Sequence, residues 1–181
     1  MLTPVSQHVF EKLGRVPFEQ VPALHPVGLF HKHWKEECEK SGVFLRKSLN
    51  PARFPKLLPW VVMVEKEPLA PGETRQQMFL NNRDYRFRYR LCGTEYGNMI
   101  GRDVTGMPVG FLQSEKDAIA MYESIEVCIA NNQPYAGETS MPLKGRSFIK
   151  IIRSVFPMST DGDEIDLALS VVAPSETRLR V

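Results

Sequence analysis

The residues from which disulfide frameworks and metal sites are built are scarce in this sequence. Its three cysteines, Cys38, Cys92 and Cys128, stand at wide and unpatterned spacings, with no CxxC motif among them. Such a set favours neither a disulfide framework nor a cysteine-based zinc site. We therefore expect reduced and mostly buried thiols.

Histidines are equally few: His8, His25, His31 and His33. Because His31 and His33 are two positions apart, they cannot share one face of a helix, which disfavours a zinc site completed by Cys38. No nucleophile with a base, no carboxylate pair and no ligand set stands out elsewhere in the chain. The sequence therefore predicts no catalytic residues, no metal site and no enzyme activity.

Excess charge and long apolar runs are also missing. The formal net charge is +2, with 24% charged and 43% hydrophobic residues, a composition typical of globular proteins. No apolar run approaches the roughly 20 residues that span a bilayer, and the N-terminus lacks the order of a secretory signal. We expect a cytoplasmic protein with one hydrophobic core and no bulk attraction to membranes or nucleic acids.

Periodic patterns indicate the first elements. Phe30 and Trp34 fall four apart within residues 29–42, as on an amphipathic helix, and Gly42 is a natural end for that helix. The valine-rich residues 57–68 (LLPWVVMVEKEP) predict a half-buried strand. The helix must pack its aromatic stripe on the sheet or pair it with a second copy of the chain.

The most regular pattern in the chain follows at residues 83–91. Apolar side chains alternate there with arginines, as expected on a strand with one core face. The two sides of this strand should carry Tyr85, Phe87, Tyr89 and Leu91 on the core face, and Arg86, Arg88 and Arg90 on the other. Gly93 would end the strand, and residues 94–100 (TEYGNMI) predict a short helix that ends at Gly101.

The second half of the chain indicates one long helix and two strands. Ser114 begins a pattern similar to a capping box, ahead of an apolar stripe, which predicts a helix over residues 114–132. Residues 146–156 and 163–173 predict two strands joined by a turn at residues 159–162. The order of elements favours an α+β fold, with a single antiparallel sheet and helices packed on one face.

One stretch of the sequence resembles a known family. Residues 87–112, FRYRLCGTEYGNMIGRDVTGMPVGFL, are similar to the segment FRYRLVGT…GRDLTG that leads from the second strand into the first helices of short standalone bacterial PAS domains. The resemblance implies a PAS-like sensor fold, a curved five-stranded antiparallel sheet that encloses a pocket with its helices. It divides the chain into an N-terminal arm and amphipathic helix (1–51), a PAS-like domain (52–173) and a C-terminal tail (174–181).

The resemblance also bears on cofactors. PAS domains that bind haem commonly use a histidine of a core helix, and no histidine follows residue 33 here, which leaves only Cys128 open as a thiolate ligand. Flavin photosensors of this fold carry an NCRFLQ-type helix with a reactive cysteine. Residues 110–113 (GFLQ) resemble its end, but no cysteine precedes them, so we expect no flavin adduct chemistry. The cofactor stays unidentified.

A PAS-like fold would place several of these side chains in a pocket beneath the helices. The residues expected to contact a ligand, through apolar bodies and polar tips, are Trp60, Phe87, Tyr89, Tyr96, Met121, Tyr122 and Ile125. A packed core without a cavity is the alternative, to which we give equal weight.

An interface with a second copy or a partner would lie elsewhere, and would use Phe30, Trp34, Arg86, Arg88 and Arg90. The row of arginines is alternatively a solvated face, or one paired with acidic residues such as Glu36 and Glu39. Nucleic-acid binding is disfavoured, because the aromatic rings should lie on the side of the strand opposite the arginines.

Two functions fit these residues. In the first, the chain is a cytoplasmic sensory module of signal transduction that binds an unidentified small molecule and relays occupancy through a homodimer or a signalling protein in trans. In the second, it is a ligand-free adaptor for protein–protein interaction that docks a partner on its sheet face. A small enzyme built on residues such as Glu95, Asp103 or Glu123 is a weaker, third interpretation.

Overall fold

The computed structural model describes residues 14–70, 83–141 and 145–180. The first 13 residues of the predicted arm, including His8, lie outside the described residues. The described elements are η1 (Phe18–Gln20), α2 (Pro26–Ser41), η2 (Arg46–Ser48), η3 (Pro51–Arg53), η4 (Leu58–Trp60), β1 (Val61–Pro68), β2 (Tyr85–Cys92), α3 (Thr94–Ile100), α4 (Glu115–Asn131), β3 (Tyr135–Ser140), β4 (Lys150–Met158) and β5 (Leu167–Pro174). None of these helices has both the length and the apolar character needed to cross a bilayer.

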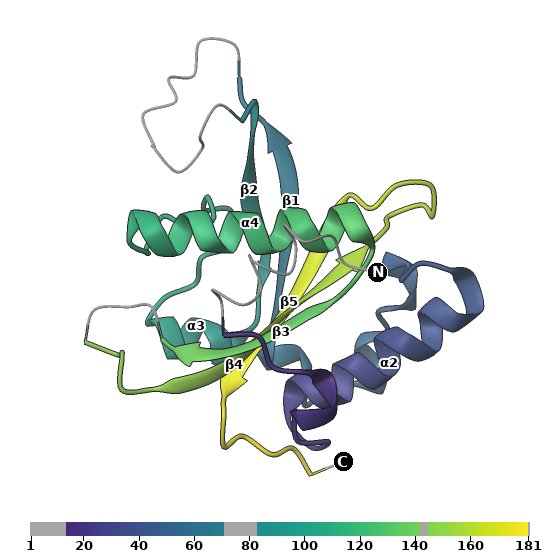
Figure 1. Cartoon of the computed structure of the whole chain (residues 1–181), viewed down its shortest axis with the longest axis horizontal. Coiled ribbons are helices and arrows are strands. Elements are labelled where there is room, and N and C mark those ends of the chain that lie inside the picture. The colour runs from purple at the N-terminus through teal and green to yellow at the C-terminus, as the bar shows by residue number, and fades with distance from the viewer. Residues whose placement is uncertain (1–13, 71–82, 142–144, 181) are drawn as a thin grey trace.

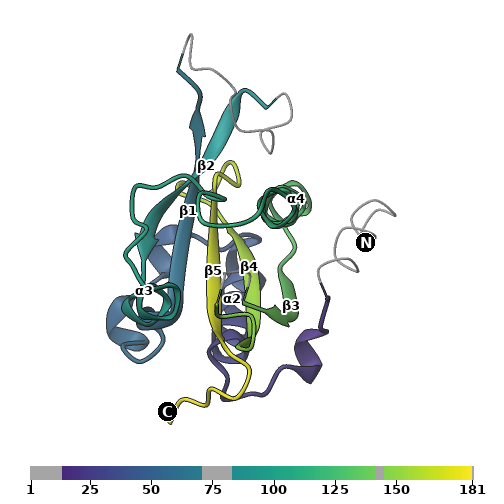
Figure 2. The ribbon, with the colours of Figure 1, turned by 90° about the vertical axis from the view of Figure 1, so that its left-hand side faces the viewer.

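Five strands form one antiparallel sheet in the order β2-β1-β5-β4-β3. The first and last strands, β1 and β5, therefore pair near the middle of the sheet, and α3 and α4 are inserted between β2 and β3 in the chain. α3 and α4 lie over one face and α2 over the other (Figures 1 and 2). The predicted α+β fold, a single five-stranded antiparallel sheet with helices on one face and an amphipathic helix before it, is confirmed.

The C-terminal ends of α2 and α3 and the start of α4 lie where the sequence predicts them, whereas α2 begins at Pro26, before the predicted residue 29. Gly42 follows α2 with a φ of 77°, and Gly101 follows α3 with a φ of 90°. Glycine adopts this left-handed conformation without the strain that other residues incur. α4 begins after Ser114, whose Oγ accepts a hydrogen bond of 3.2 Å from the backbone N–H of Asp117. Local chemistry thus determines these boundaries.

The alternation of β2 is interrupted once. Tyr89 and Leu91 pair with consecutive residues of β1, so Arg90 is an extra residue on β2, as in a β-bulge. Beyond the bulge the two sides of the strand exchange, because side chains alternate with a period of two. Leu91, which the pattern predicted in the core, is 43% exposed, and Cys92 packs against the core instead.

Hydrophobic clusters cover both faces of the sheet. The cluster on the side of α3 and α4, here the α4-side cluster, includes Phe87, Tyr89, Tyr96, Tyr122 and Ile125. The cluster beneath α2, here the α2-side cluster, includes Phe30, Trp34, Phe44, Phe156 and Leu169. β5 contributes side chains to both clusters, so both of its faces are covered.

Phe30 and Trp34, predicted to form an interface, are buried against the sheet of their own chain. The Phe30 ring lies 4.8 Å from that of Phe156, and the side chain is fully buried. The indole N–H of Trp34 donates a hydrogen bond of 3.1 Å to the carbonyl oxygen of Pro157. The structure therefore corrects this prediction, because the apolar stripe of α2 is already covered by β4 and β5.

The two outer strands of the sheet each bond to a further segment of the chain. On β3, the backbone N–H of Val16 donates to the carbonyl oxygen of Ala136 at 2.9 Å. On β2, the backbone N–H of Val109 donates to the carbonyl oxygen of Phe87 at 2.8 Å, within the loop at residues 106–109. Both outer strands therefore have main-chain partners on their outward sides.

His25 holds the N-terminus of α2. Its Nδ1 accepts a hydrogen bond of 3.1 Å from the backbone N–H of Val27, and its Nε2 lies 3.1 Å from the carbonyl oxygen of Pro174, to which it donates. These bonds require a neutral imidazole that carries its proton on Nε2. Burial lowers the pKa of His25 below its ordinary value, outweighing the opposite effect of the bond to Pro174.

We expect the free energy of unfolding to fall as the pH drops below about 6.5. The pKa of His25 is depressed in the folded state, so the unfolded chain takes up the proton first and gains stability relative to the folded chain. Burial also lowers the pKa values of His31 and His33, which act in the same direction. Urea unfolding at several pH values between about 5.5 and 8 measures how the free energy of unfolding changes with pH.

The variant His25→Asn provides the control for this prediction. Asparagine is a favourable N-cap residue and does not titrate in this range. Between about pH 7.5 and 5.5, the free energy of unfolding should therefore decline less in the variant than in the unsubstituted protein. An equal decline in both proteins would show that His25 makes no contribution to the pH dependence.

Candidate functional site

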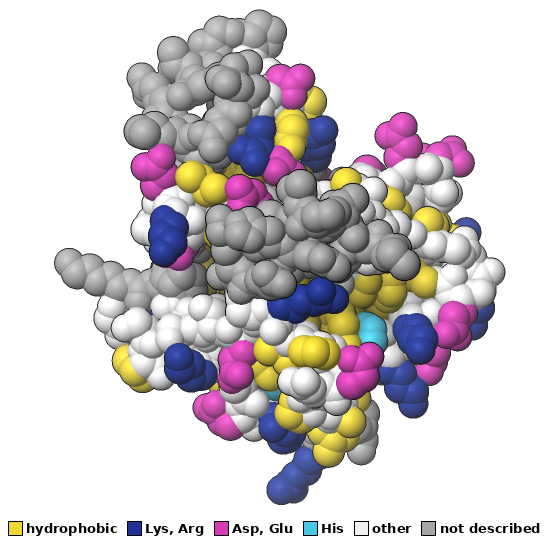
Figure 3. All heavy atoms as spheres, viewed as in Figure 1, with side chains coloured by type: hydrophobic (Ala, Val, Ile, Leu, Met, Phe, Trp, Pro, Cys, Tyr) yellow, Lys and Arg dark blue, Asp and Glu magenta, His cyan; other side chains and the backbone are white. Residues whose placement is uncertain are grey.

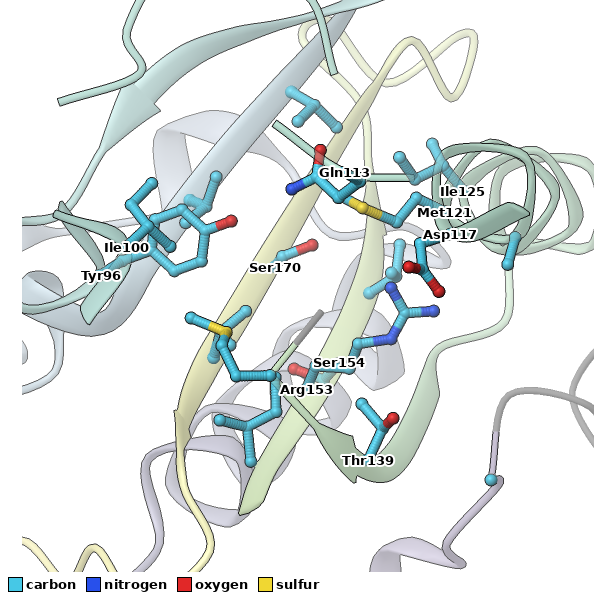
Figure 4. A pocket seen from close by; sticks show the side chains of 18 of the residues that line it. Tyr96, Ile100, Gln113, Asp117, Met121, Ile125, Thr139, Arg153, Ser154 and Ser170 are labelled. Carbon is cyan, nitrogen blue, oxygen red and sulfur yellow. The ribbon is translucent and has the colours of Figure 1, made fainter. Parts of the chain in front are cut away.

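A cavity of about 380 Å³ lies between the sheet and the helices α3 and α4 (Figure 4). Strands β1, β2, β4 and β5 contribute its floor, and α3 and α4 contribute its sides. Its apolar lining includes Val64, Ile100, Ile125, Met141, Ile151 and Val172. This volume falls in the range of about 300–1,000 Å³ that is typical of small-molecule sites.

The turn from β2 into α3 positions the helix that supplies Tyr96 and Ile100 to the cavity. The backbone N–H of Gly93 donates to the carbonyl oxygen of Val61 at 2.8 Å, which draws the turn against the start of β1. A Cβ atom on Gly93 would lie 2.6 Å from the carbonyl oxygen of Leu58 and closer still to that of Pro59. Only glycine fits this approach, and it places Tyr96 of α3 over the cavity.

The predicted ligand-binding residues divide into those that line the cavity and those that do not. The lining residues among them are Tyr89, Tyr96, Met121 and Ile125. Phe87 and Tyr122 belong to the same cluster but pack against each other, with ring centroids 5.1 Å apart. The hydroxyl of Tyr122 accepts a hydrogen bond of 3.1 Å from the backbone N–H of Phe87. These two residues therefore support the wall of the cavity.

Trp60 does not line the cavity, although the sequence analysis placed it there. Continued alternation from Val62 and Val64, which line the cavity, would direct Trp60 to the same side. However, Trp60 ends the 3₁₀ turn η4 just before β1, and its side chain packs against the α2-side cluster. The strand periodicity does not extend through this turn.

Arg153 is a cavity residue that the sequence analysis missed. It lies on β4 between Ile151 and Val155, in the register of the side chains that face α4, and it is half-buried. Its side chain projects into the space between β4 and α4 (Figure 4). The signal for it was a charged residue at an inward position of an otherwise apolar strand, where a charge is costly without a partner.

The contacts of Arg153 within the chain are modest. Its Nη2 donates to the Oγ of Ser124 at 3.4 Å, and its guanidinium carbon lies 5.7 Å from the centre of the Tyr135 ring. The positive charge of Arg153 also lowers the pKa of Tyr135, against the larger raising effect of burial. Within the described parts of the chain, Arg153 forms no ion pair with an aspartate or glutamate.

Two tyrosine hydroxyls add polar groups to the cavity. Burial is the main cause that raises the pKa values of Tyr89 and Tyr96. Both side chains are therefore neutral near pH 7, and the Tyr96 hydroxyl keeps its own proton to donate.

Gln113, which precedes α4, contributes a polar group to the cavity. Its carboxamide projects into the cavity (Figure 4), and its buried Oε1 has no hydrogen-bond partner among the described residues. A buried acceptor of this kind costs stability unless a ligand or water supplies a donor. Gln113 is thus a second cavity residue outside the sequence-based set.

Helix α4 is joined to β2 by more than the apolar packing. Glu126 of α4 accepts hydrogen bonds from Arg83, at 2.8 Å between Nη2 and Oε2, and from the hydroxyl of Tyr85. Tyr122, one turn earlier on α4, accepts the bond from Phe87 described above. A displacement of α4 would therefore also act on β2.

The arginine row (Arg86, Arg88 and Arg90) is paired within the sheet. Arg86 contacts Glu67 at 2.6 Å, while Arg88 and Arg90 both pair with Glu65. These partners belong to β1. The alternative partners considered from the sequence, Glu36 and Glu39, belong to α2 and are not the ones that pair with these arginines. Such half-exposed pairs contribute about 0–1 kcal/mol each. Figure 3 shows basic and acidic side chains interspersed on the visible face of the molecule.

The structure gives the remaining cysteine and histidine candidates packing roles. Burial raises the pKa of the Cys128 thiol, which disfavours a thiolate ligand. The His31 ring stacks on Phe18 at 3.8 Å, and the Nε2 of His33 lies 3.3 Å from the carbonyl oxygen of Ser48. In the described segments, no three His, Cys, Asp or Glu side chains gather as a metal site would require.

Known proteins resemble this chain only distantly. No family model and no curated protein matches it. It is similar to a crystal structure of the PAS domain of a protein from Colwellia psychrerythraea, with 14% identity, a TM-score of 0.44, and coverage of 68% of this chain and 94% of that one. It is also similar to a fungal LOV domain photoreceptor, with 12% identity, a TM-score of 0.38, and coverage of 62% and 74%.

Proposed function

We propose that the chain is a sensory module that binds a small molecule in the cavity between the sheet and α4. The observation that carries this proposal is the convergence of polar groups from Arg153, Tyr96 and Gln113 in a cavity of about 380 Å³ whose walls include Val64, Ile125 and Val172. Apolar walls with a few placed donors and acceptors are characteristic of small-molecule sites. A bound molecule would also supply the donor that Gln113 lacks.

We propose a binding role without chemical catalysis. The carboxylates considered for an enzyme, Glu95, Asp103 and Glu123, do not line the cavity. Asp103 instead accepts a hydrogen bond of 2.8 Å from the backbone N–H of Thr105, which holds a turn. A site that binds without reacting needs no general base in contact with its ligand.

In this proposal, occupancy is relayed through α4 and β2. α4 lines the cavity with Met121 and Ile125, and it is joined to β2 through Tyr122 and Glu126. A ligand that binds one position of α4 more tightly than another shifts the population by its difference in affinity. The receiving surface would be the side of β1 and β2 that carries the arginine row and the exposed Leu91, offered to a second copy or to a signalling protein.

Native mass spectrometry of freshly purified protein tests the binding proposal. We expect a fixed mass difference from a co-purified small molecule, and we expect Met121→Trp to remove it because the larger side chain fills the cavity. Ala130→Trp is the matched control, since Ala130 is exposed near the end of the same helix and does not line the cavity. The control should retain the bound molecule.

Two results would contradict the proposal. One is a protein of bare chain mass whose thermal stability does not respond to a diverse library of small molecules, because a ligand stabilises the fold that binds it. The other is a partner that binds Met121→Trp as tightly as the unsubstituted chain. That second result would favour the ligand-free adaptor.

A further inference from the structure

We infer that the cavity takes a small organic acid whose carboxylate binds Arg153 and whose apolar body lies against the walls. This inference rests on the proposed function, because it assigns a ligand class to the same site. It follows from three features of the cavity: an incompletely satisfied guanidinium, an apolar lining and an unpartnered acceptor.

The guanidinium of Arg153 has donors to spare. An arginine carries five N–H donors in a planar fork. Among the described residues, Arg153 donates a long hydrogen bond of 3.4 Å to Ser124 and interacts with the ring and hydroxyl of Tyr135. A half-buried guanidinium favours an anionic partner, and a carboxylate matches its fork with two parallel hydrogen bonds.

The two carboxylates of the described lining, Asp117 and Glu138, form no ion pair with Arg153. Asp117 lies on the same side of the cavity as Arg153 in Figure 4. Its carboxylate accepts a hydrogen bond of 2.7 Å from the hydroxyl of Ser114 at the start of α4. Glu138 and Lys116 are exposed, one of each sign, at the rim. Arg153 is half-buried whereas Lys116 is exposed, so the guanidinium is the cation that a carboxylate inside the cavity would contact.

The rest of the cavity defines the body of the ligand. Val64, Ile125, Ile151 and Val172 present apolar surface, which gains free energy from an aliphatic or aromatic body of matching size. The Oε1 of Gln113 calls for one donor on that body, such as a hydroxyl group. A highly charged or strongly hydrated molecule, by contrast, would leave these walls unsatisfied.

Matched pairs of acids and amides test the inference. The probes are hexanoate, octanoate, 3-phenylpropanoate and 3-(4-hydroxyphenyl)propanoate, each with its neutral primary amide. Calorimetric titration should show at least one acid that binds at least tenfold more tightly than its amide. Arg153→Gln should weaken binding of that acid by about 10- to 100-fold, as expected for hydrogen bonds to a charged group, and leave the amide unchanged.

Arg153→Lys keeps the charge without the fork, so its affinity for the acid should lie between those of the other two proteins. The comparison of acid with amide in the unsubstituted protein needs no variant, and it therefore decides the question even if a variant does not fold. The inference is overturned if no acid in the panel binds, if amides bind as well as acids, or if Arg153→Gln leaves the affinity unchanged.

The two proposals fail in different ways. A neutral molecule that co-purifies with the unsubstituted chain and is lost from Met121→Trp would support the sensory cavity and overturn the organic-acid inference. Absence of any bound molecule, with no response to acids, amides or the wider library, would overturn both.

Discussion

Replacing Phe30 with alanine should lower the free energy of unfolding by about 3–5 kcal/mol, the usual cost of deleting a buried phenylalanine ring. The Phe30 side chain is fully buried between α2 and the sheet. Its ring centroid lies 4.8 Å from that of Phe156, 5.6 Å from that of Phe44 and 6.1 Å from that of His33. These neighbouring rings are each held by their own part of the chain. They therefore move only in part into the space that the Phe30 ring would leave.

Urea unfolding of the variant measures this loss, with Phe148→Ala as the control. Phe148 is 79% exposed, so the same substitution there should change the free energy of unfolding by no more than about 0.5 kcal/mol. A loss below about 1 kcal/mol in Phe30→Ala would mean that α2 is not packed on the sheet in solution. In that case, the stripe of Phe30 and Trp34 would again be a candidate interface.

Gly93→Ala should cost about 3 kcal/mol, at the upper end of the usual penalty for overpacking. The added Cβ would meet the carbonyl oxygens of Leu58 and Pro59, the former at 2.6 Å. Both obstacles are backbone atoms of the turn before β1, which cannot rotate away as the end of a flexible side chain can. The substitution therefore has to push α3 away from β1, and it should also reduce ligand binding in the adjoining cavity.

Gly97→Ala, four residues further on, is the matched control. A Cβ atom there would lie 3.4 Å from the carbonyl oxygen of Arg102 and 3.7 Å from the Sγ of Cys92, which are ordinary contacts. Because alanine favours a helix over glycine by about 0.5–1 kcal/mol, this variant should be as stable as the unsubstituted chain or more so. Thermal unfolding compares the two variants, and equal losses in both would refute the steric explanation for Gly93.

Features that depend on neighbouring residues in the chain could be predicted from the sequence. The ends of α2 and α3 follow from glycine at residues 42 and 101, and the start of α4 follows from Ser114. The inward positions of Phe87 and Tyr89 follow from the strict alternation ahead of the bulge. These signals are local, so one sequence is enough to identify them.

Features that depend on strand pairing could not be predicted in this way. The bulge that turns Leu91 outward exists because two residues of β2 face one residue of β1, which is a property of the pair of strands. β3 was not recognised as a strand, because residues 135–140 (YAGETS) are short and contain a glycine and little apolar alternation. Its pairing with β4 defines it as a strand.

The candidate site could be predicted only in part, because some of its residues belong to a local periodic pattern and others do not. Tyr89 and Met121 have the periodicity of core side chains, and both line the cavity. Arg153 was missed because its strand was predicted from its β-branched residues, and a single arginine forms no pattern. The arginine row was considered because its three members alternate regularly. That row forms pairs with the adjacent strand, whereas the isolated Arg153 lies in the cavity.

The main-chain bonds on the outer strands restrict how a partner could dock. Val16 occupies one edge of the sheet and the loop at 106–109 occupies part of the other, so these stretches offer few free N–H and C=O groups for strand addition. A partner that extended the sheet there would first have to displace a segment of this chain. A partner that binds without displacing such a segment must contact side chains instead. Its affinity would therefore change with point substitutions on the surface.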